Sequence, residues 1–220
     1  MINPVWRKIL GLASGQPPAD PARFNDPLAL QTQWTPASRG GSNFRTHRLV
    51  EIDVARVEFR ASGAAKFFYS FFALVGIVCA VVFLFGADEP LEFTSDTMVP
   101  VLVGVFFAFI GGFMFYSGTT PIVFDKGIGY YWRGRKSPQD VLEVSSLKKC
   151  ARLDQIHAIQ LVSEWVRGSK TSYYSYELNL VLEDASRMTV IDHGNLSKLR
   201  EDARKLADFL GKPVWDSIDR

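Results

Sequence analysis

Two uncharged stretches decide the fold: residues 67–86, FFYSFFALVGIVCAVVFLFG, and residues 98–118, MVPVLVGVFFAFIGGFMFYSG. An α-helix of roughly 20 apolar residues crosses a hydrocarbon core of about 30 Å, so each stretch is long enough for one crossing. The connection between them, residues 87–97, is polar and acidic. The pattern therefore predicts a transmembrane helical hairpin over residues 67–118.

The charges that flank this hairpin predict its orientation. Residues 1–66 carry nine Lys or Arg, and the chain after the second stretch carries the other sixteen. The connection, residues 87–97, has four acidic residues and no Lys or Arg. Positively charged flanks stay on the cytoplasmic side of a membrane. Both termini are therefore expected in the cytoplasm, with the connection outside.

Small residues indicate how the two helices meet. Gly104, Gly111 and Gly112 lie in the second stretch, and Gly76 and Ala80 lie four apart in the first. Small side chains allow helix backbones to approach closely in lipid. We expect these residues to pack the two helices against each other; a homodimer interface is the alternative.

The first 43 residues are expected to be an N-terminal segment followed by a flexible linker. Residues 13–43 are rich in Pro, Gly, Ser, Gln and Ala, a composition that buries little apolar surface. Residues 1–12 contain Trp6, Arg7 and Lys8 and predict either a short amphipathic helix on the membrane surface or a frayed terminus.

Short strands are predicted on both sides of the helical hairpin. In the region before the hairpin, residues 44–66, alternation over 47–60 favours one strand or a bent pair that joins the sheet formed later in the chain. Residues 121–132 read as a β-hairpin with glycine in its turn, and 156–166 as a further strand. Residues 172–183 alternate apolar with polar side chains, which is typical of one buried and one solvated face.

A single amphipathic helix is predicted near the C-terminus. Leu196, Leu199, Leu206 and Leu210 recur at helical spacing, and Gly211 follows them. Asn195 or Ser197 is expected to cap its start. The apolar stripe predicts packing on the chain's own sheet, with partner binding as the alternative, and Trp215 is expected to fold back onto the domain. Residues 137–150 predict no regular element.

Antiparallel strands that end in one amphipathic helix resemble the pleckstrin-homology-like fold, in particular bacterial inner-membrane proteins that place such a domain after a two-span hairpin. The resemblance lies in IVFDKGIGYYWRG (122–134), LDQIHAIQLVSE (153–164) and the strand–hairpin–helix run over 174–210. It implies an α+β cytoplasmic domain over residues 119–220, with an antiparallel sheet or partial barrel capped by the C-terminal helix. It also implies a multi-pass protein of the bacterial inner (cytoplasmic) membrane that acts as an interaction or assembly module.

One candidate contact site follows the second membrane stretch and combines aromatic with basic side chains: Tyr130, Tyr131, Trp132, Arg133, Arg135 and Lys136. Basic residues near an anionic membrane surface each contribute on the order of 1 kcal/mol of binding energy. The site is therefore expected to contact lipid headgroups or a partner. The alternative is that the basic residues only set the orientation, in a solvated turn.

A second candidate site, for an anion or polar group, consists of Asp192, His193 and Asn195 just before the C-terminal helix. Helix N-termini bind anions well. The alternative is an ordinary strand-to-helix turn whose asparagine caps the helix.

Motifs for other kinds of chemistry are missing from the sequence. It contains no GxSxG, Walker or GxGxxG motif, and the neighbours of His47, His157 and His193 lack the spacing of zinc ligands. No cofactor or metal is expected, and a net charge of +2 argues against nucleic acid as a partner. The membrane is expected to separate Cys79 from Cys150, so no disulfide is predicted.

Three functional hypotheses are consistent with these features. The first is a membrane-anchored binding or scaffold module, an accessory or assembly component of a complex, whose partners are the lipid bilayer and another membrane protein. The second is a module that binds anionic lipid at the membrane face. The third is an enzyme that uses Asp192 and His193.

Overall fold

The computed structural model describes residues 20–38, 40–85, 95–143, 147, 149–167 and 171–219. It divides into two compact units. The hairpin unit is Ala61–Thr120, and the sheet unit combines Met1–Arg60 with Pro121–Arg220. The predicted N-terminal segment 1–12 and most of the connection 87–97 lie outside the described residues.

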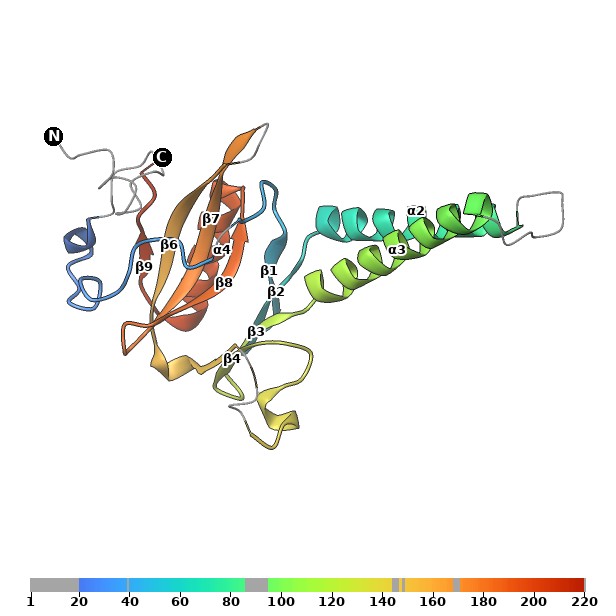
Figure 1. Ribbon diagram of the computed structural model, residues 1–220. Coiled ribbons are helices and arrows are strands. Elements are labelled where there is room, and N and C mark those ends of the chain that lie inside the picture. The colour runs from blue at the N-terminus through green and yellow to red at the C-terminus, as the bar shows by residue number, and fades with distance from the viewer. Residues whose placement is uncertain are drawn as a thin grey trace. The chain divides into compact units, whose positions relative to one another are not determined.

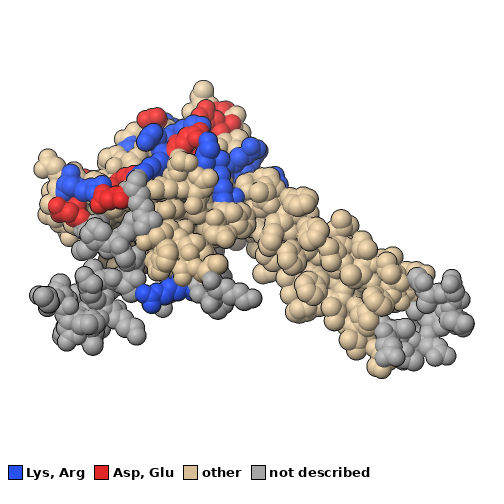
Figure 2. Space-filling view, turned by 90° about the horizontal axis from the view of Figure 1, so that it is seen from above, with Lys and Arg blue, Asp and Glu red and all other residues tan. Residues whose placement is uncertain are grey.

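The hairpin unit consists of two helices, α2 (Gly63–Phe85) and α3 (Ser95–Gly118). Both are long and apolar enough to cross a membrane. Large apolar side chains on both helices, such as Leu74 and Leu102, are exposed, whereas the core helix of a soluble protein would bury them. The surface seen in Figure 2 agrees: Lys, Arg, Asp and Glu gather on the sheet unit, and most of the described surface of the hairpin carries none of them.

Glycines bring the two helix backbones into contact, as the small residues predicted. A methyl group at Gly76 would lie 2.2 Å from the backbone nitrogen of Ala108, and one at Gly104 would lie 2.7 Å from that of Ala80. Gly112 differs, because a methyl group there would meet nothing within 4 Å. Packing within the hairpin is thus confirmed for Gly76 and Gly104, while Gly112 faces away from the partner helix.

The first sheet has five strands in the order β1-β2-β3-β4-β5. They are β1 (His47–Asp53), β2 (Arg56–Ala61), β3 (Ile122–Asp125), β4 (Tyr130–Arg133) and β5 (Cys150–Arg152). The predicted bent pair over residues 47–60 is confirmed as β1 and β2. The β-hairpin after the membrane stretch is confirmed as β3 and β4, with Gly129 at a φ of +81° in its turn.

The helical hairpin is inserted between two neighbouring strands of this sheet. Strands β2 and β3 pair antiparallel, so that Phe59 lies opposite Ile122 although the whole hairpin unit separates them in sequence. Ser62 alone links β2 to α2, and residues 119–121 link α3 to β3. The prediction that the strand region before the hairpin joins the later sheet is confirmed.

The second sheet has the order β8-β7-β6-β9. It consists of β6 (Ile156–Arg167), β7 (Ser172–Leu182), β8 (Arg187–His193) and the short β9 (Val214–Asp216), which runs parallel to β6. Three short 3-10 helices complete the described elements of this unit: η2 (Pro21–Phe24), η3 (Pro138–Asp140) and η5 (Leu153–Gln155). The predicted return of Trp215 onto the domain is confirmed, since this residue of β9 is buried.

The C-terminal helix is α4 (Leu196–Leu210). Asn195 caps it: its Oδ1 accepts a hydrogen bond of 3.1 Å from the backbone N–H of Lys198. Gly211 ends the helix at a φ of +67°, a left-handed conformation that glycine adopts without steric cost. The predicted helix and its cap are therefore confirmed.

The main core lies between the two sheets and α4. It contains Phe59 and Phe124 from the first sheet, Leu178 from the second and Leu206 from α4, all buried. The described elements thus form an α+β arrangement of two sheets with a C-terminal helix, which confirms that part of the predicted fold class.

The N-terminal segment departs from the prediction that it buries little. Residues 20–38 and 40–43 lie on the face of the second sheet opposite α4 (Figure 1, blue). Phe24 and Trp34 stack with ring centroids 5.0 Å apart, and both pack near Trp215. His157 on β6 bonds Asp26 through Nε2 at 2.8 Å. The prediction was wrong for this part because the two aromatic rings supply the apolar surface that the average composition hides.

Candidate functional site

The candidate site is the polar face of the second sheet under residues 33–38 and 40–43, which we call the strap. Ser175, Glu177 and Asn179 of β7, predicted to face solvent, are each 0% exposed. The alternation correctly grouped these side chains on one face. The prediction that this face is exposed to solvent was wrong, because the strap covers it.

Two carboxylates hold the strap by its backbone. Glu177 accepts hydrogen bonds from the N–H groups of Ala37, at 2.9 Å, and Ser38, at 2.7 Å. Glu164 accepts one from the N–H of Gly40 at 3.1 Å. Charge-assisted hydrogen bonds of this kind compensate a buried carboxylate for lost water. At residues 37, 38 and 40 the strap is therefore held through its backbone N–H groups, whatever side chains these residues carry.

Asp192 on β8 lies directly beneath the strap. The Ser175 hydroxyl donates a hydrogen bond to Asp192 Oδ1. A methyl group at Gly41 would lie 2.1 Å from that oxygen, so glycine is what lets the strap pass this close. Burial raises the pKa of Asp192 to about 7; Ser175 acts against the shift, and the charges of Glu177 and Glu164 add to it.

Asp192 and His193 lie on opposite faces of β8 and do not form a catalytic pair. Glu177 lies opposite Asp192 and Tyr176 opposite His193 in the β7–β8 ladder, and successive strand residues point to opposite faces. His193 is fully buried on the core side, where its Nδ1 accepts a hydrogen bond of 3.2 Å from the N–H of Asn195. The predicted group of Asp192, His193 and Asn195 is thus divided between the polar face, the core and the cap of α4.

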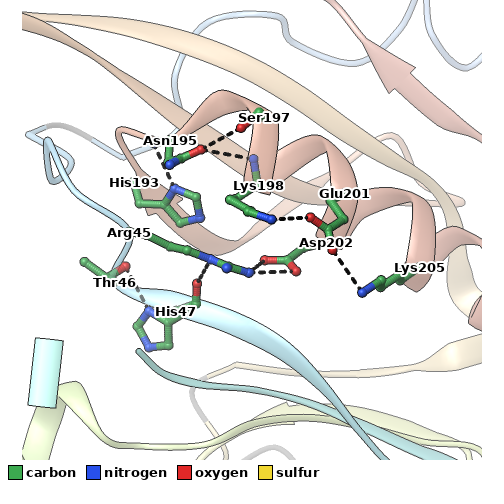
Figure 3. Close-up of polar contacts among 10 residues, drawn as sticks. All are labelled: Arg45, Thr46, His47, His193, Asn195, Ser197, Lys198, Glu201, Asp202 and Lys205. Carbon is green, nitrogen blue, oxygen red and sulfur yellow. Dashed lines mark hydrogen bonds and ion pairs between the residues drawn. The ribbon is translucent and has the colours of Figure 1, made fainter. Parts of the chain in front are cut away.

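A buried ion pair fastens the end of the N-terminal segment to α4 (Figure 3). The Arg45 guanidinium donates to both carboxylate oxygens of Asp202, at 2.7 and 3.0 Å, and its Nε donates to the carbonyl of His47 at 3.0 Å. The Asp202 side chain is only 2% exposed. Burial raises the pKa of Asp202, and the Arg45 charge offsets part of that increase.

Two histidines near this ion pair are buried in neutral form. Burial, with the charge of Arg133 acting in the same direction, lowers the pKa of His47 to about 4. Burial, followed by the charge of Arg45, lowers the pKa of His193 to about 4. The Nε2 atoms of both histidines are buried with no hydrogen-bond partner in the described part of the chain. Protonation of either ring is therefore unfavourable in the folded protein.

We expect the His193→Gln variant to be less sensitive to acid than the wild-type protein. Below pH 6.5 the unfolded chain protonates His193 while the folded chain does not, so folding stability falls with pH down to about 4. One such histidine costs on the order of 3 kcal/mol by pH 4. Urea unfolding of both proteins between pH 4 and 7 measures the difference.

The control for this prediction is the His157→Gln variant. The hydrogen bond that His157 donates to the Asp26 carboxylate raises the pKa of His157, so its stabilisation is present below pH 6.5 and is lost as pH rises through the raised value. The two variants should therefore differ from wild type with opposite trends in pH. Parallel curves for wild type and His193→Gln would contradict the prediction.

The predicted aromatic and basic contact site is divided by the first sheet. Tyr131 is 0% and Trp132 2% exposed, so neither ring contacts lipid or a partner in this structure. Tyr131 packs in the core against Phe124 with ring centroids 4.9 Å apart, and the Arg56 guanidinium lies 5.6 Å from the centre of the Trp132 ring. Consecutive strand residues point to opposite faces, and here both faces are covered.

The remaining members of that group lie nearer the surface. Tyr130 and Arg133 are half-buried, and Arg135 and Lys136 are exposed in the turn that follows β4. Of the predicted contact site, the exposed part is therefore the basic turn with Arg135 and Lys136.

Sequence reasoning missed the residues that hold the strap. Gln160 is fully buried on β6; its Nε2 donates to the carbonyl of Gln33 at 2.9 Å, and its Oε1 accepts from Arg187 at 3.1 Å. The signal that was available is Trp34, a large aromatic residue inside the proline-rich segment, followed by the Gly40-Gly41 pair. An aromatic ring there indicates packing rather than a linker.

Metal binding and disulfide chemistry receive no support from the part of the chain that the structure describes. No group of three or more His, Cys, Asp or Glu is placed to hold a metal ion among those residues. Cys79 and Cys150 are both free thiols. The arrangement under the strap supplies hydrogen-bonding carboxylates and one titratable carboxyl group.

Comparison with known proteins gave no match: no family model, curated protein or solved structure is similar to this chain. A function for this chain is therefore inferred from its own residues and their geometry.

Proposed function

We propose that this chain is a two-span protein of the bacterial inner membrane whose sheet unit lies on the cytoplasmic side and acts as a binding or scaffold module for another membrane protein. The Lys and Arg that flank the hairpin, nine before and sixteen after, support this orientation. The α+β sheet unit with its C-terminal helix is consistent with a pleckstrin-homology-like domain in this role.

The insertion of the hairpin between β2 and β3 is the observation that carries this proposal. Both ends of the anchor continue into neighbouring strands of one sheet, through a single residue on one side and three on the other. A short connector has little conformational freedom, since one extended residue spans at most about 3.6 Å. We therefore expect such short links to limit how far the sheet unit can move from the membrane, where a scaffold for membrane proteins would meet its partner.

The turn between β1 and β2 is the candidate partner surface. Val54 is 96% exposed and Ile52, at the end of β1, is 40% exposed. Exposed apolar residues grouped at one end of a sheet are typical of protein contacts. We therefore expect a partner to contact this turn.

Photo-crosslinking in native membranes tests the proposal. A photoreactive residue at position 54 is expected to give the same protein adduct in repeated preparations. The matched control is position 204, an exposed Arg of α4 that is not part of the turn. Adducts that form equally at both positions, or only with the chain itself, would contradict the proposal.

Anionic lipid is a second candidate ligand, supported by the loop between β4 and β5. Leu142 is fully exposed there, and the loop begins with the exposed Arg135 and Lys136. A photoreactive residue at position 142 should then label lipid rather than protein, and the Arg135→Ser, Lys136→Ser double variant should reduce that labelling. Protein labelling at 142 would favour the scaffold role alone.

A further inference from the structure

Three acidic side chains from three adjacent strands lie under the strap. Glu164 comes from β6, Glu177 from β7 and Asp192 from β8. Glu177 and Glu164 accept hydrogen bonds from the backbone N–H groups of residues 37, 38 and 40. The strap therefore brings three carboxyl groups together on one covered face of the sheet.

Asp192 differs from the other two, because among the described residues its carboxyl group accepts no hydrogen bond from the strap backbone. Glu177 accepts a third hydrogen bond from Asn179 Nδ2, at 3.1 Å. Within the described residues, the Asp192 carboxyl accepts a hydrogen bond from the Ser175 hydroxyl and from no backbone N–H of the strap. Gly41 packs directly onto its oxygens, so the strap separates this carboxyl from water on that side. Asp192 is half-buried, and a carboxylate that is partly shielded from water and has so few donors is costly when it is ionised.

Within the part of the chain that the structure describes, the charged groups around Asp192 do not neutralise it. Glu177 and Glu164 are the charged neighbours that act on it, and both are acidic. The nearby cations act on Glu177 instead: both Arg187, which donates to Gln160, and Lys149, which donates to the carbonyl of Thr189, interact with its charge. Ionised Asp192 is thus repelled by its neighbours while the strap is closed.

We propose that residues 37, 38 and 40–42 form a pH-sensitive cover, which lies closed over the polar face while Asp192 is protonated and loosens when Asp192 is ionised. When the strap opens, the Asp192 carboxyl group releases its proton to water. The carboxylate is then solvated on the side that Gly41 covers in the closed strap. Ser42, which bridges to His193 at the end of β8, then leaves the edge of that strand. The proposal does not depend on the scaffold role.

The direction of the effect follows from linkage. With the strap closed the pKa of Asp192 is about 7, and with the strap open it returns toward its ordinary value of 3.8. Between these values, opening releases one proton, so the open-to-closed ratio rises about ten-fold per pH unit and levels off above pH 7. Low pH therefore favours the closed strap.

Hydrogen exchange of the full-length protein in detergent micelles tests this proposal. The amides of residues 37, 38, 40 and 41 are followed from pH 5 to 8, with rates corrected for intrinsic exchange. In the wild-type protein we expect the open-to-closed ratio of the strap to rise about ten-fold per pH unit up to pH 7. In the Asp192→Asn variant we expect this ratio to be independent of pH. Asp208→Asn, which changes an exposed carboxylate of α4, should keep the wild-type slope.

A wild-type opening ratio that does not change with pH, or an Asp192→Asn variant that keeps the slope, would overturn the proposal. The Ser175→Ala variant provides an independent test if Asp192→Asn does not fold. It removes the donor that favours the ionised carboxylate, so the levelling point should move to higher pH. An unchanged levelling point in this variant would equally overturn it. Amides in the centre of β6 and β7 report whether each variant is folded.

Discussion

Replacement of Arg45 by alanine is expected to lower the free energy of unfolding of the sheet unit by about 3–5 kcal/mol, the cost of leaving a buried charge without its partner. Asp202 is 2% exposed and receives two hydrogen bonds from the Arg45 guanidinium. In the variant this carboxyl must either stay ionised in the core or take up a proton. Denaturant unfolding followed by tryptophan fluorescence measures the loss.

The pH dependence of this variant separates the lost charge pair from lost packing. Burial already raises the pKa of Asp202, and removal of Arg45 should raise it further. A protonated carboxyl needs no counter-charge, so the deficit relative to wild type should shrink from pH 8 to pH 5. Arg204→Ala on the exposed side of α4 is the control and should change stability by less than about 0.5 kcal/mol. A deficit that is the same at all pH values would contradict the charge-pair explanation.

The second large effect is expected from Gly76→Ala in the helical hairpin. The added methyl group would lie 2.2 Å from the backbone nitrogen of Ala108, and a backbone cannot rotate away as a side chain can. The two helices must separate, at a cost of about 2–3 kcal/mol by comparison with overpacked cores. Spin labels at the exposed positions Leu74 and Leu102, in a background without Cys79 and Cys150, should report a longer and broader distance distribution.

Gly112→Ala is the matched control for this substitution. A methyl group at position 112 meets nothing within 4 Å, so the same chemical change adds no contact. Alanine is favoured over glycine in a helix by about 1 kcal/mol in water, so no loss of hairpin packing is expected. If both variants gave the same distance distribution as the parent, the close approach at Gly76 would not hold.

The sequence predicted local elements well where one physical signal dominates. The two uncharged stretches gave α2 and α3, the leucine spacing with Asn195 and Gly211 gave α4, and alternation gave β7. Each of these signals lies within a short window of the chain. They require only hydrophobic periodicity and capping chemistry, which do not depend on distant residues.

The candidate site was harder to predict because it depends on a distant segment. Glu177 and Asn179 have the side chains of a solvated face, and only the strap, some 140 residues earlier, makes that face buried. In the same way, Tyr131 and Trp132 suit a membrane interface by residue type, but the pairing of β4 with β3 and β5 places them inside. Contacts between segments that are distant in the sequence cannot be predicted from the composition of either segment alone.

The pairing of β2 with β3 across the helical hairpin has a consequence for biogenesis. The 62 residues between Phe59 and Ile122 would ordinarily make this strand pair slow to form, because closing a long loop lowers chain entropy before any contact compensates. Packing of α2 on α3 brings Tyr69 against Gly118 and so draws the ends of that loop together. We therefore expect β2 and β3 to pair after the two helices have met, and a chain whose hairpin fails to form leaves β2 with β1 as its sole neighbour in the sheet. Formation of the hairpin is thus expected to precede completion of the first sheet.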